Sequence, residues 1–171
     1  MTDIQQVRAI TNPQRAYQWE VTINGLSTGN NADLVFHAKT VAIPNSQVDT
    51  FAINYKAAHV YFAGRDSSSH TVTITFWDDE SQKVREYFQN WFDTLMFNPL
   101  TGGQTPKNLY TADINLRLMD SSGDVSTAKI VLTDAFPSEI GDISLSYETS
   151  DSLELSVTFM YDVKSIVNTA L

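Results

Sequence analysis

The sequence predicts a mainly β domain built from antiparallel sheets, with one amphipathic α-helix. Two patterns lead to this class. Several segments alternate apolar and polar residues with a period of two, which puts one face of a strand in the core and the other in water. Strands with one wet face are typical of antiparallel sheets, because parallel sheets are covered on both faces. One segment instead repeats its apolar residues at helical spacing.

The clearest period-two alternation lies at residues 17–23, 71–76, 112–118, 128–132 and 153–163. Weaker strand candidates are residues 34–41 and 140–147. We expect a turn around Pro137 and Gly141, because acidic residues, which are common in turns, surround both positions: Asp134, Glu139 and Asp142.

The helix is expected over residues 79–97. Its apolar stripe follows the i, i+3, i+4, i+7 spacing of a helix face and consists of Val84, Tyr87, Phe88, Trp91, Phe92, Leu95 and Met96. Asp79 and Gln82 resemble a capping box at the start, and Asn98-Pro99 ends the segment. We expect this stripe to pack against a sheet as core rather than to hold a cofactor.

Composition excludes several classes of protein. The 171 residues suit one domain over residues 1–171, which buries roughly 70% of its unfolded surface. The absence of cysteine excludes disulfides and thiolate metal sites. With 20 acidic and 11 basic side chains the net charge is −9, which argues against gripping nucleic acid phosphates or an anionic membrane. No apolar run approaches the roughly 18 residues of a membrane helix, and residues 1–15 lack the apolar core of a signal peptide. We therefore expect folding in a cytoplasm, without membrane insertion.

No residue pattern indicates catalysis, a metal or a cofactor. His37, His59 and His70 lie in separate segments and lack the spacing of a metal-binding pair. The acidic run 78–80 fits the start of a helix better than a metal cluster. The sequence TGGQ at 101–104 lacks the lysine and the flanking elements of a phosphate loop. We therefore expect a protein that is not an enzyme and needs no cofactor.

Residues 44–66 hold four aromatic residues and only four of Lys, Arg or Asp. Two alternatives fit this composition. The segment could form two further core strands, or a long hairpin that projects from the body. A projecting hairpin would expose its apolar residues in a monomer, and exposed apolar patches usually mark contact surfaces.

The edges of these sheets need partners. Unpaired N–H and C=O groups at an edge invite further strands, and proteins close a barrel, blunt the edge or pair it with a neighbour. Here lysine is scarce and most prolines lie outside the clear strand segments. Pairing between copies is one solution, and a head-to-tail contact of this kind can close into a ring.

Three stretches resemble the tail tube protein family of contractile-tailed bacteriophages, which includes the tubes of related injection machines. The first is VYFAGR at 60–65 followed by TVTITFWDDE at 71–80 and the aromatic helix. The second is LTGG at 100–103, and the third is AFPSEIGDISL at 135–145 leading into ELSVTFMYD at 154–162. With the strands between them, the resemblance covers most of residues 16–162.

The resemblance implies a β-sandwich or barrel-like subunit that forms hexameric rings, each with a continuous inner β-barrel, stacked inside a contractile sheath in the virion. It implies that residues 44–66 are a hairpin reaching the adjacent ring, with ring-stacking contacts at Phe51, Ile53, Tyr55, Tyr61, Phe62 and Arg65. The N-terminal arm (1–15) and the C-terminal tail (164–171) are then contacts that become ordered on assembly. The implied partners are further copies of this chain, the tail sheath protein, the baseplate tube initiator, and tape measure protein and DNA in the channel.

The negative charge has a use in such a tube. Acidic groups on the inner face would repel DNA and keep it moving, whereas basic groups would bind its phosphates. Candidates for these lumen positions, chosen from the polar sides of strands, are Glu20, Asp113, Asp142 and Glu154. A solvated outer face is an equally good account of each one.

Three alternatives remain. The chain could be the baseplate tube initiator, or the tube of a phage-like particle that injects protein. It could also be a monomeric β-barrel that carries a ligand, which would need a closed sheet and a lined cavity. The compact size, without an added domain, favours the polymerising tube subunit made and assembled in the host bacterial cytoplasm.

Overall fold

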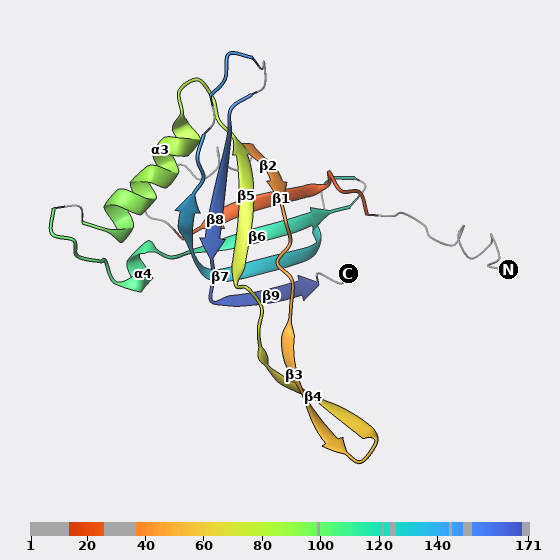
Figure 1. Cartoon of the computed structure of the whole chain (residues 1–171). Coiled ribbons are helices and arrows are strands. Elements are labelled where there is room, and N and C mark those ends of the chain that lie inside the picture. Colours follow the sequence, from red (N-terminus) through yellow and green to blue (C-terminus); the bar gives the residue numbers. More distant parts are fainter. Residues whose placement is uncertain are drawn as a thin grey trace.

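The computed structural model describes residues 14–25, 37–98, 100–120, 122–123, 126–143, 145–148 and 152–168. Two antiparallel sheets share one long strand, a helical segment lies beside them, and a hairpin projects away from the body (Figure 1). This arrangement confirms the predicted mainly β, antiparallel class. None of the helices in these ranges is long and apolar enough to cross a membrane.

Sheet A contains β1 (Trp19–Asn24), β6 (Ala112–Met119), β7 (Ser126–Ile140) and β9 (Val163–Asn168). Strand β6 lies between β1 and β7, and β9 pairs with the opposite side of β7. All three pairings are antiparallel. In the register, Leu116 of β6 lies opposite Val21 on one side and Ile130 on the other. Apolar side chains of neighbouring strands therefore form rows on the inner face.

Sheet B contains the second half of β7, then β8 (Glu154–Met160), β5 (Thr71–Trp77) and β2 (Ala38–Val41). Its pairings are also antiparallel. In Figure 1 the strands of sheet B run across those of sheet A. The inner faces of the two sheets form the core, as in an orthogonally packed sandwich.

Strand β7 changes sheets near Asp134. Up to Ala135 it pairs with β6, and from Phe136 onward it pairs with β8. Asp134 has a left-handed backbone (φ 56°), and the register shifts again at Pro137. The turn expected around Pro137 is therefore wrong, because the strand bends through irregular positions instead of ending. Proline is tolerated there since the residue lies at a bulge on an edge of sheet B.

The core is filled by side chains from both sheets and from the helical segment. In β1, β5, β6 and β8 every second residue points inward, as the alternation predicted. The residues that are at most 2% exposed include Ile74, Phe76, Ile114, Leu132, Val157 and Phe159.

The helical segment is shorter than expected and changes pitch. Helix α3 (Lys83–Asn90) continues as a π-helical turn, η1 (Trp91–Met96). The apolar stripe faces the core: Val84, Phe88, Trp91 and Met96 are buried, and Tyr87, Phe92 and Leu95 pack against them. Phe88 lies 5.1 Å from the Phe76 ring and 5.7 Å from the Phe159 ring, measured between centroids.

The expected capping box is not formed. Gln82 is the N-cap, with a left-handed backbone (φ 53°), so the helix begins at Lys83 instead of residue 79. The acidic residues still serve the helix start. The Asp79 carboxylate accepts a hydrogen bond from the Lys83 N–H at 3.3 Å, and Asp78 accepts one from the Val84 N–H at 3.3 Å.

Several strand boundaries differ from the prediction, the largest change being β7, which runs from Ser126 to Ile140 instead of over residues 128–132. Residues 141–143 and 145–148 are not strand, since β7 ends at Ile140. The long run 153–163 divides at Tyr161, where the chain leaves sheet B and enters sheet A. Residues 164–168 belong to β9 and pair with β7 within the subunit, so they are not a tail that awaits assembly. Residues 1–13, 34–36 and 169–171 lie outside the described part.

Two short elements complete the fold. Helix α4 (Lys107–Tyr110), which the periodicity did not predict, presents the Tyr110 carbonyl to the Trp91 indole N–H at 2.7 Å. This hydrogen bond satisfies the one polar group of a side chain that is otherwise buried. The strands β3 (Val48–Tyr55) and β4 (Ala58–Asp66) form the projecting hairpin.

The aromatic contacts of Phe88 predict a large loss of stability on truncation. We expect Phe88→Ala to lower the free energy of unfolding by about 3–5 kcal/mol, because a fully buried ring leaves a cavity. Denaturant unfolding of the two proteins measures the difference. The exposed neighbour Arg85→Ala serves as control, with a change within about 0.5 kcal/mol. A loss below about 1 kcal/mol for Phe88→Ala would contradict this account of the core.

Gly141 predicts a backbone constraint where β7 meets β8. Its N–H donates to the Ser156 carbonyl at 2.7 Å, and a Cβ added there would lie 2.9 Å from the same oxygen. We expect Gly141→Ala to destabilise the fold by about 1–3 kcal/mol, as overpacking does. Gly103→Ala, which would meet only a side-chain hydroxyl at 3.3 Å, is the control. Equal melting temperatures for the two variants would refute the constraint.

Candidate assembly interface

The projecting hairpin is the most conspicuous surface of the subunit. Every residue of β3 and β4 is exposed, and the two strands pair only with each other (Figure 1). The alternative in which residues 44–66 supply two core strands is therefore wrong. An isolated two-stranded ribbon is marginal in water, so this hairpin needs support at its base or a partner along its length.

The register divides the hairpin into two different faces. Phe51 lies opposite Phe62, and Ile53 lies opposite Val60. Since side chains two residues apart share a face, one face is apolar and contains Phe51, Ile53, Tyr55, Ala58, Val60 and Phe62. The Phe51 and Phe62 rings stack with centroids 5.4 Å apart. We call this set the apolar hairpin face.

The opposite face is more polar. It carries Asn54 and His59, whose side chains are hydrogen-bonded at 2.6 Å, together with Tyr61. Tyr61 therefore does not share a face with the other expected stacking residues. Arg65 lies near the base, beyond the irregular pairing around Gly64. Val60, which sequence reasoning did not select, belongs to the apolar hairpin face. The pairing register reveals it, whereas composition does not.

Gly64 is required by the backbone at this irregularity. The pairing passes from Thr50 opposite Ala63 to Val48 opposite Asp66, so β4 contains one more residue than β3 there. A Cβ at Gly64 would lie 3.0 Å from the Asp49 carbonyl oxygen. The glycine thus allows a bulge that bends the ribbon near its base.

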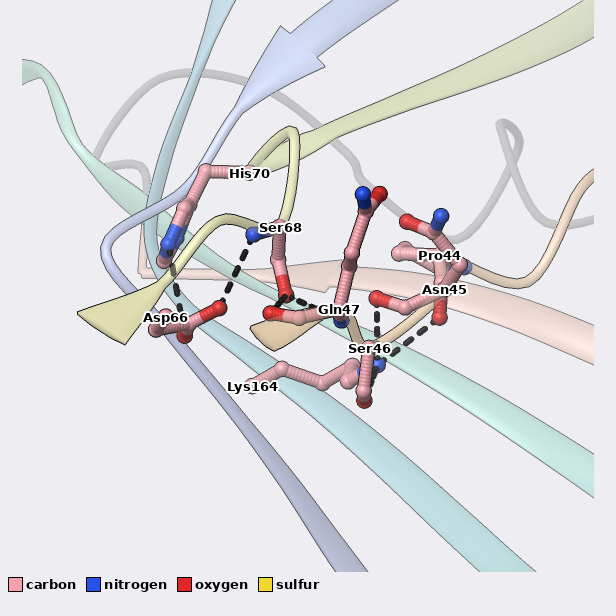
Figure 2. A network of polar contacts seen from close by, with 8 residues as sticks. All are labelled: Pro44, Asn45, Ser46, Gln47, Asp66, Ser68, His70 and Lys164. Carbon is pink, nitrogen blue, oxygen red and sulfur yellow. Dashed lines mark hydrogen bonds and ion pairs between the residues drawn. The ribbon is translucent and has the colours of Figure 1, made fainter. Parts of the chain in front are cut away.

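The base of the hairpin is held by a polar network (Figure 2). On the outgoing limb, the Lys164 ammonium of β9 donates to the Pro44 carbonyl at 2.8 Å, the Asn45 carbonyl at 2.9 Å and the Ser46 hydroxyl at 2.7 Å. The limbs are joined through Gln47: its carbonyl accepts from the Ser67 N–H and its N–H donates to the Ser68 hydroxyl, both at 2.9 Å.

Asp66 completes the returning limb. Its carboxylate accepts the Ser68 N–H at 2.9 Å and lies 3.7 Å from the His70 ring nitrogen. Hydrogen bonds from Ser68 lower the pKa of Asp66, and the nearby charges of His70 and Lys164 add to this effect. The carboxylate is therefore ionised at neutral pH and remains an acceptor. Neither Lys164 nor this network was selected from the sequence, because the two segments are far apart in the chain.

The four expected lumen carboxylates do not gather on one face. Glu20 and Asp113 lie on sheet A, and Glu154 lies on sheet B. Asp142 follows the end of β7. The outer face of sheet A also carries Arg117, 3.7 Å from Glu20, and Lys129. Acidic and basic groups therefore balance on that face.

The outer face of sheet B is rich in hydroxyl groups. Thr73 and Thr158 are hydrogen-bonded at 3.1 Å, and Thr75 and Ser156 at 3.2 Å, across β5 and β8. Glu154 is paired with Lys39 of β2. The helical segment packs on the inner face of this sheet, against Phe76 and Phe159, so the hydroxyl face stays open. These residues are the polar halves of predicted strands, but only the pairing brings them together.

The sheet edges lie on two opposite sides of the subunit. Strand β1 is the edge strand on one side of sheet A, and β2 is the edge strand on one side of sheet B. Trp19 of β1, Val41 of β2 and the nearby Ile43 line a surface hollow of about 330 Å³. On the other side lie β9 and the second half of β7. Strand β9 exposes apolar side chains there, with Val163 58% and Ile166 61% exposed. In the part of the chain that the structure describes, no further strand pairs with either side.

Titratable groups do not converge on a site. In the described ranges there is no cluster of three or more His, Asp or Glu side chains suited to a metal ion. His59 bonds to Asn54 and His70 lies beside Asp66, both on the hairpin or its base. Lys107 of α4 is paired with Asp162, whose hydrogen bond raises the pKa of the lysine. These groups hold local structure together.

Comparison with solved structures gives the same fold. The sheath/tube terminator of the extracellular contractile injection system PVC is 14% identical, with 92% of this chain and 99% of that chain covered and a TM-score of 0.70. The PVC sheath-tube complex is 15% identical, with 99% of this chain and 100% of that chain covered and a TM-score of 0.66. The tube terminating cap of the anti-feeding prophage is 13% identical, with 94% of each chain covered and a TM-score of 0.69.

Comparison of sequences identifies the family. No curated protein sequence matches the chain. The family model described as phage tail tube protein, however, matches residues 6–165. This range includes the helical segment, the hairpin and both sheets except the last residues of β9, and it agrees with the fold shared with contractile injection machines. The chain therefore belongs to the phage tail tube protein family.

Proposed function

We propose that this chain is the structural subunit of an inner tail tube. Copies form hexameric rings, and the rings stack inside a contractile sheath to make the channel through which DNA enters the host cell. The observation that carries the proposal is the exposed apolar face of a hairpin that extends away from the body. Such a face in a monomer is explained by a partner that covers it.

The strand directions support a head-to-tail ring. Each sheet has four strands in sequence with alternating directions, so its first and last strands are antiparallel. When copies are related by rotation about an axis, β1 of one copy can therefore lie antiparallel to β9 of the next. The same holds for β2 and the second half of β7. Pairing of this kind removes free edges.

The direction of the hairpin supports sheet B as the wall of the channel. The hairpin connects β2 to β5 and continues away from both of them (Figure 1). If it reaches the adjacent ring, the strands of sheet B run between rings, as barrel strands around a channel do. The face turned to the channel is then the open hydroxyl face. Of the four carboxylates expected in the lumen, only Glu154 lies on it.

A hydroxyl wall would let a polyanion pass because it does not bind phosphates, whereas the sequence led us to expect repulsion by acidic groups. Neutral hydroxyls offer no cations whose binding to phosphates would release counterions and hold the strand. Lys39 and Glu154 on this face are paired with each other, and Glu139 of β7, opposite Thr158, adds one exposed carboxylate. The wall is thus weakly charged, and repulsion by a dense acidic lining is not part of the proposal.

The proposed partners follow from the position of each surface. Further copies contact the edges and the hairpin, and a sheath protein surrounds the tube; the similar PVC structure is a complex of sheath and tube. The baseplate tube initiator would start the stack, and tape measure protein and then DNA would occupy the channel. The particle is a virion assembled in the bacterial cytoplasm, and the subunit acts without catalysis.

The tube of a phage-like injection particle is the second candidate. The structures with TM-scores from 0.65 to 0.70 come from such machines, and a weakly charged hydroxyl wall also accepts protein cargo. A monomeric ligand carrier is disfavoured, because the core between the sheets is filled by side chains such as Ile74, Ile114 and Val157.

Assembly of the purified protein tests the proposal directly. We expect rings with six times the subunit mass, and stacked tubes at high concentration, in mass photometry and electron microscopy. Elongation without a baseplate supports the tube subunit, and a single ring that never elongates indicates the initiator. A monomer that persists at every concentration refutes both the tube subunit and the initiator.

The apolar hairpin face predicts selective loss of stacking. We expect Phe51→Ser combined with Ile53→Ser to leave rings intact and to prevent tubes, because each lost side chain removes about 1.5–3 kcal/mol of apolar burial. Electron microscopy counts rings and tubes. The control is Tyr61→Ser, which removes an aromatic side chain from the opposite face of the hairpin. Normal tubes from the double variant would overturn the stacking role.

The channel wall predicts an effect of charge on delivery. We expect Thr73→Lys, on the hydroxyl face, to leave tubes intact and to reduce delivery of DNA, since a ring of ammonium groups binds phosphates. Asn24→Lys, at the exposed end of β1 on sheet A, is the control. Infectivity of particles carrying each variant gives the readout. Reduced infectivity for Asn24→Lys alone would place sheet A at the channel instead.

A further inference from the structure

We propose that Lys164 sets the direction of the hairpin and couples it to the edge strand β9. The assembly part of this inference rests on the proposed function. Lys164 has no part in either surface described above: it belongs neither to the apolar hairpin face nor to the hydroxyl face. Its ammonium instead bridges a strand of sheet A to the segment that leads into β3 (Figure 2).

The three hydrogen bonds make Lys164 a well-defined anchor. An ammonium has three donors, and here each has an acceptor at 2.7–2.9 Å: two consecutive backbone carbonyls and the Ser46 hydroxyl. Because the acceptors lie on three successive residues, they fix both the position and the orientation of this segment. A charged donor also makes stronger hydrogen bonds than a neutral one.

Few other contacts hold the hairpin. Strands β3 and β4 pack extensively only on each other. A cleft of about 490 Å³ lies between the hairpin base and the body, lined by residues that include Gln47, Asp66, His70 and Lys164. At the base, Pro44 is buried and the His70 ring lies 5.5 Å from the Tyr161 ring. The projecting strands themselves have no core packing, so the direction of the hairpin depends on the contacts at its base, among which Lys164 makes three hydrogen bonds.

The contact of Lys164 with the outgoing limb also restrains the returning limb, because the two limbs are hydrogen-bonded to each other. The segment gripped by Lys164 leads directly to Gln47, which is hydrogen-bonded to Ser67 and Ser68 on the returning limb. Ser68 in turn donates its N–H to Asp66 at the end of β4. The two limbs thus form one unit, and the hydrogen bonds of Lys164 join this unit to β9.

The location of Lys164 gives the anchor a role in assembly. Strand β9 pairs with β7 on one side and has a free edge on the other. That edge is where the next copy in a ring would pair. Pairing would immobilise β9, and through Lys164 it would also immobilise the hairpin base. A hairpin already held in its binding direction loses less conformational freedom on stacking, so ring closure would favour addition of the next ring.

The variant Lys164→Met removes the ammonium and keeps a long apolar side chain. In the monomer at low concentration, we expect amide hydrogen exchange at residues 46–48 and 67–68 to rise at least tenfold. In assembly, we expect rings to form and tube elongation to slow at least tenfold. The control is Lys129→Met, on the adjacent strand β7 and on the outer face of sheet A, which should change neither rate.

The outcomes separate this inference from the proposed function. Unchanged exchange for Lys164→Met overturns the anchor, and faster exchange with normal elongation overturns the coupling. If the natural chain forms no rings, the proposed function fails, while the exchange measurement still decides whether Lys164 holds the hairpin. Ser46→Ala removes one acceptor without altering β9. It should raise exchange in the same segment by a smaller factor, and it tests the anchor if Lys164→Met fails to fold.

Discussion

The sharing of β7 between the two sheets is the constraint on which the rest of this subunit depends. One strand of 15 residues pairs with β6 and β9 in its first part and with β8 in its second. The change of partner near Asp134 turns the chain across the core, so the two sheets cannot shift independently. It also places β9 and the end of β7 together on one side of the subunit, and β1 and β2 on the other.

This arrangement creates a subunit whose surfaces are unequal. Its buried apolar residues fill the space between the sheets and beneath the helical segment, with aromatic contacts that extend from Phe76 through Phe88 to Trp91. The hairpin differs, since it presents stacked aromatic rings to water and is held at its base by hydrogen bonds. Its apolar surface weakens the monomer in isolation and would strengthen a stack of rings, because burial of that surface is gained only in the assembly.

The net charge of the chain does not show which face carries the charged side chains. A net charge of −9 suggested an acidic channel, yet three of the carboxylates proposed for it are divided between two sheets and the fourth, Asp142, follows β7. Two of them, Glu154 and Glu20, are paired with a lysine and an arginine. The open face of sheet B carries hydroxyl groups in hydrogen-bonded pairs. If this face lines a channel, as proposed, it would lower adhesion by offering few cations and would not require strong repulsion.

The sequence by itself determined the class of fold, the apolar stripe of the helix and the family, because these depend on local periodicity and on the order of short motifs. It could not determine where β7 and the hairpin would bend, since the left-handed backbone at Asp134 and the bulge at Gly64 have no period. The faces of the hairpin, the separation of Glu20 from Glu154 and the role of Lys164 were decided by strand register and by contacts between distant segments. Those contacts are formed only when the sheets pack, so no local pattern in the chain encodes them.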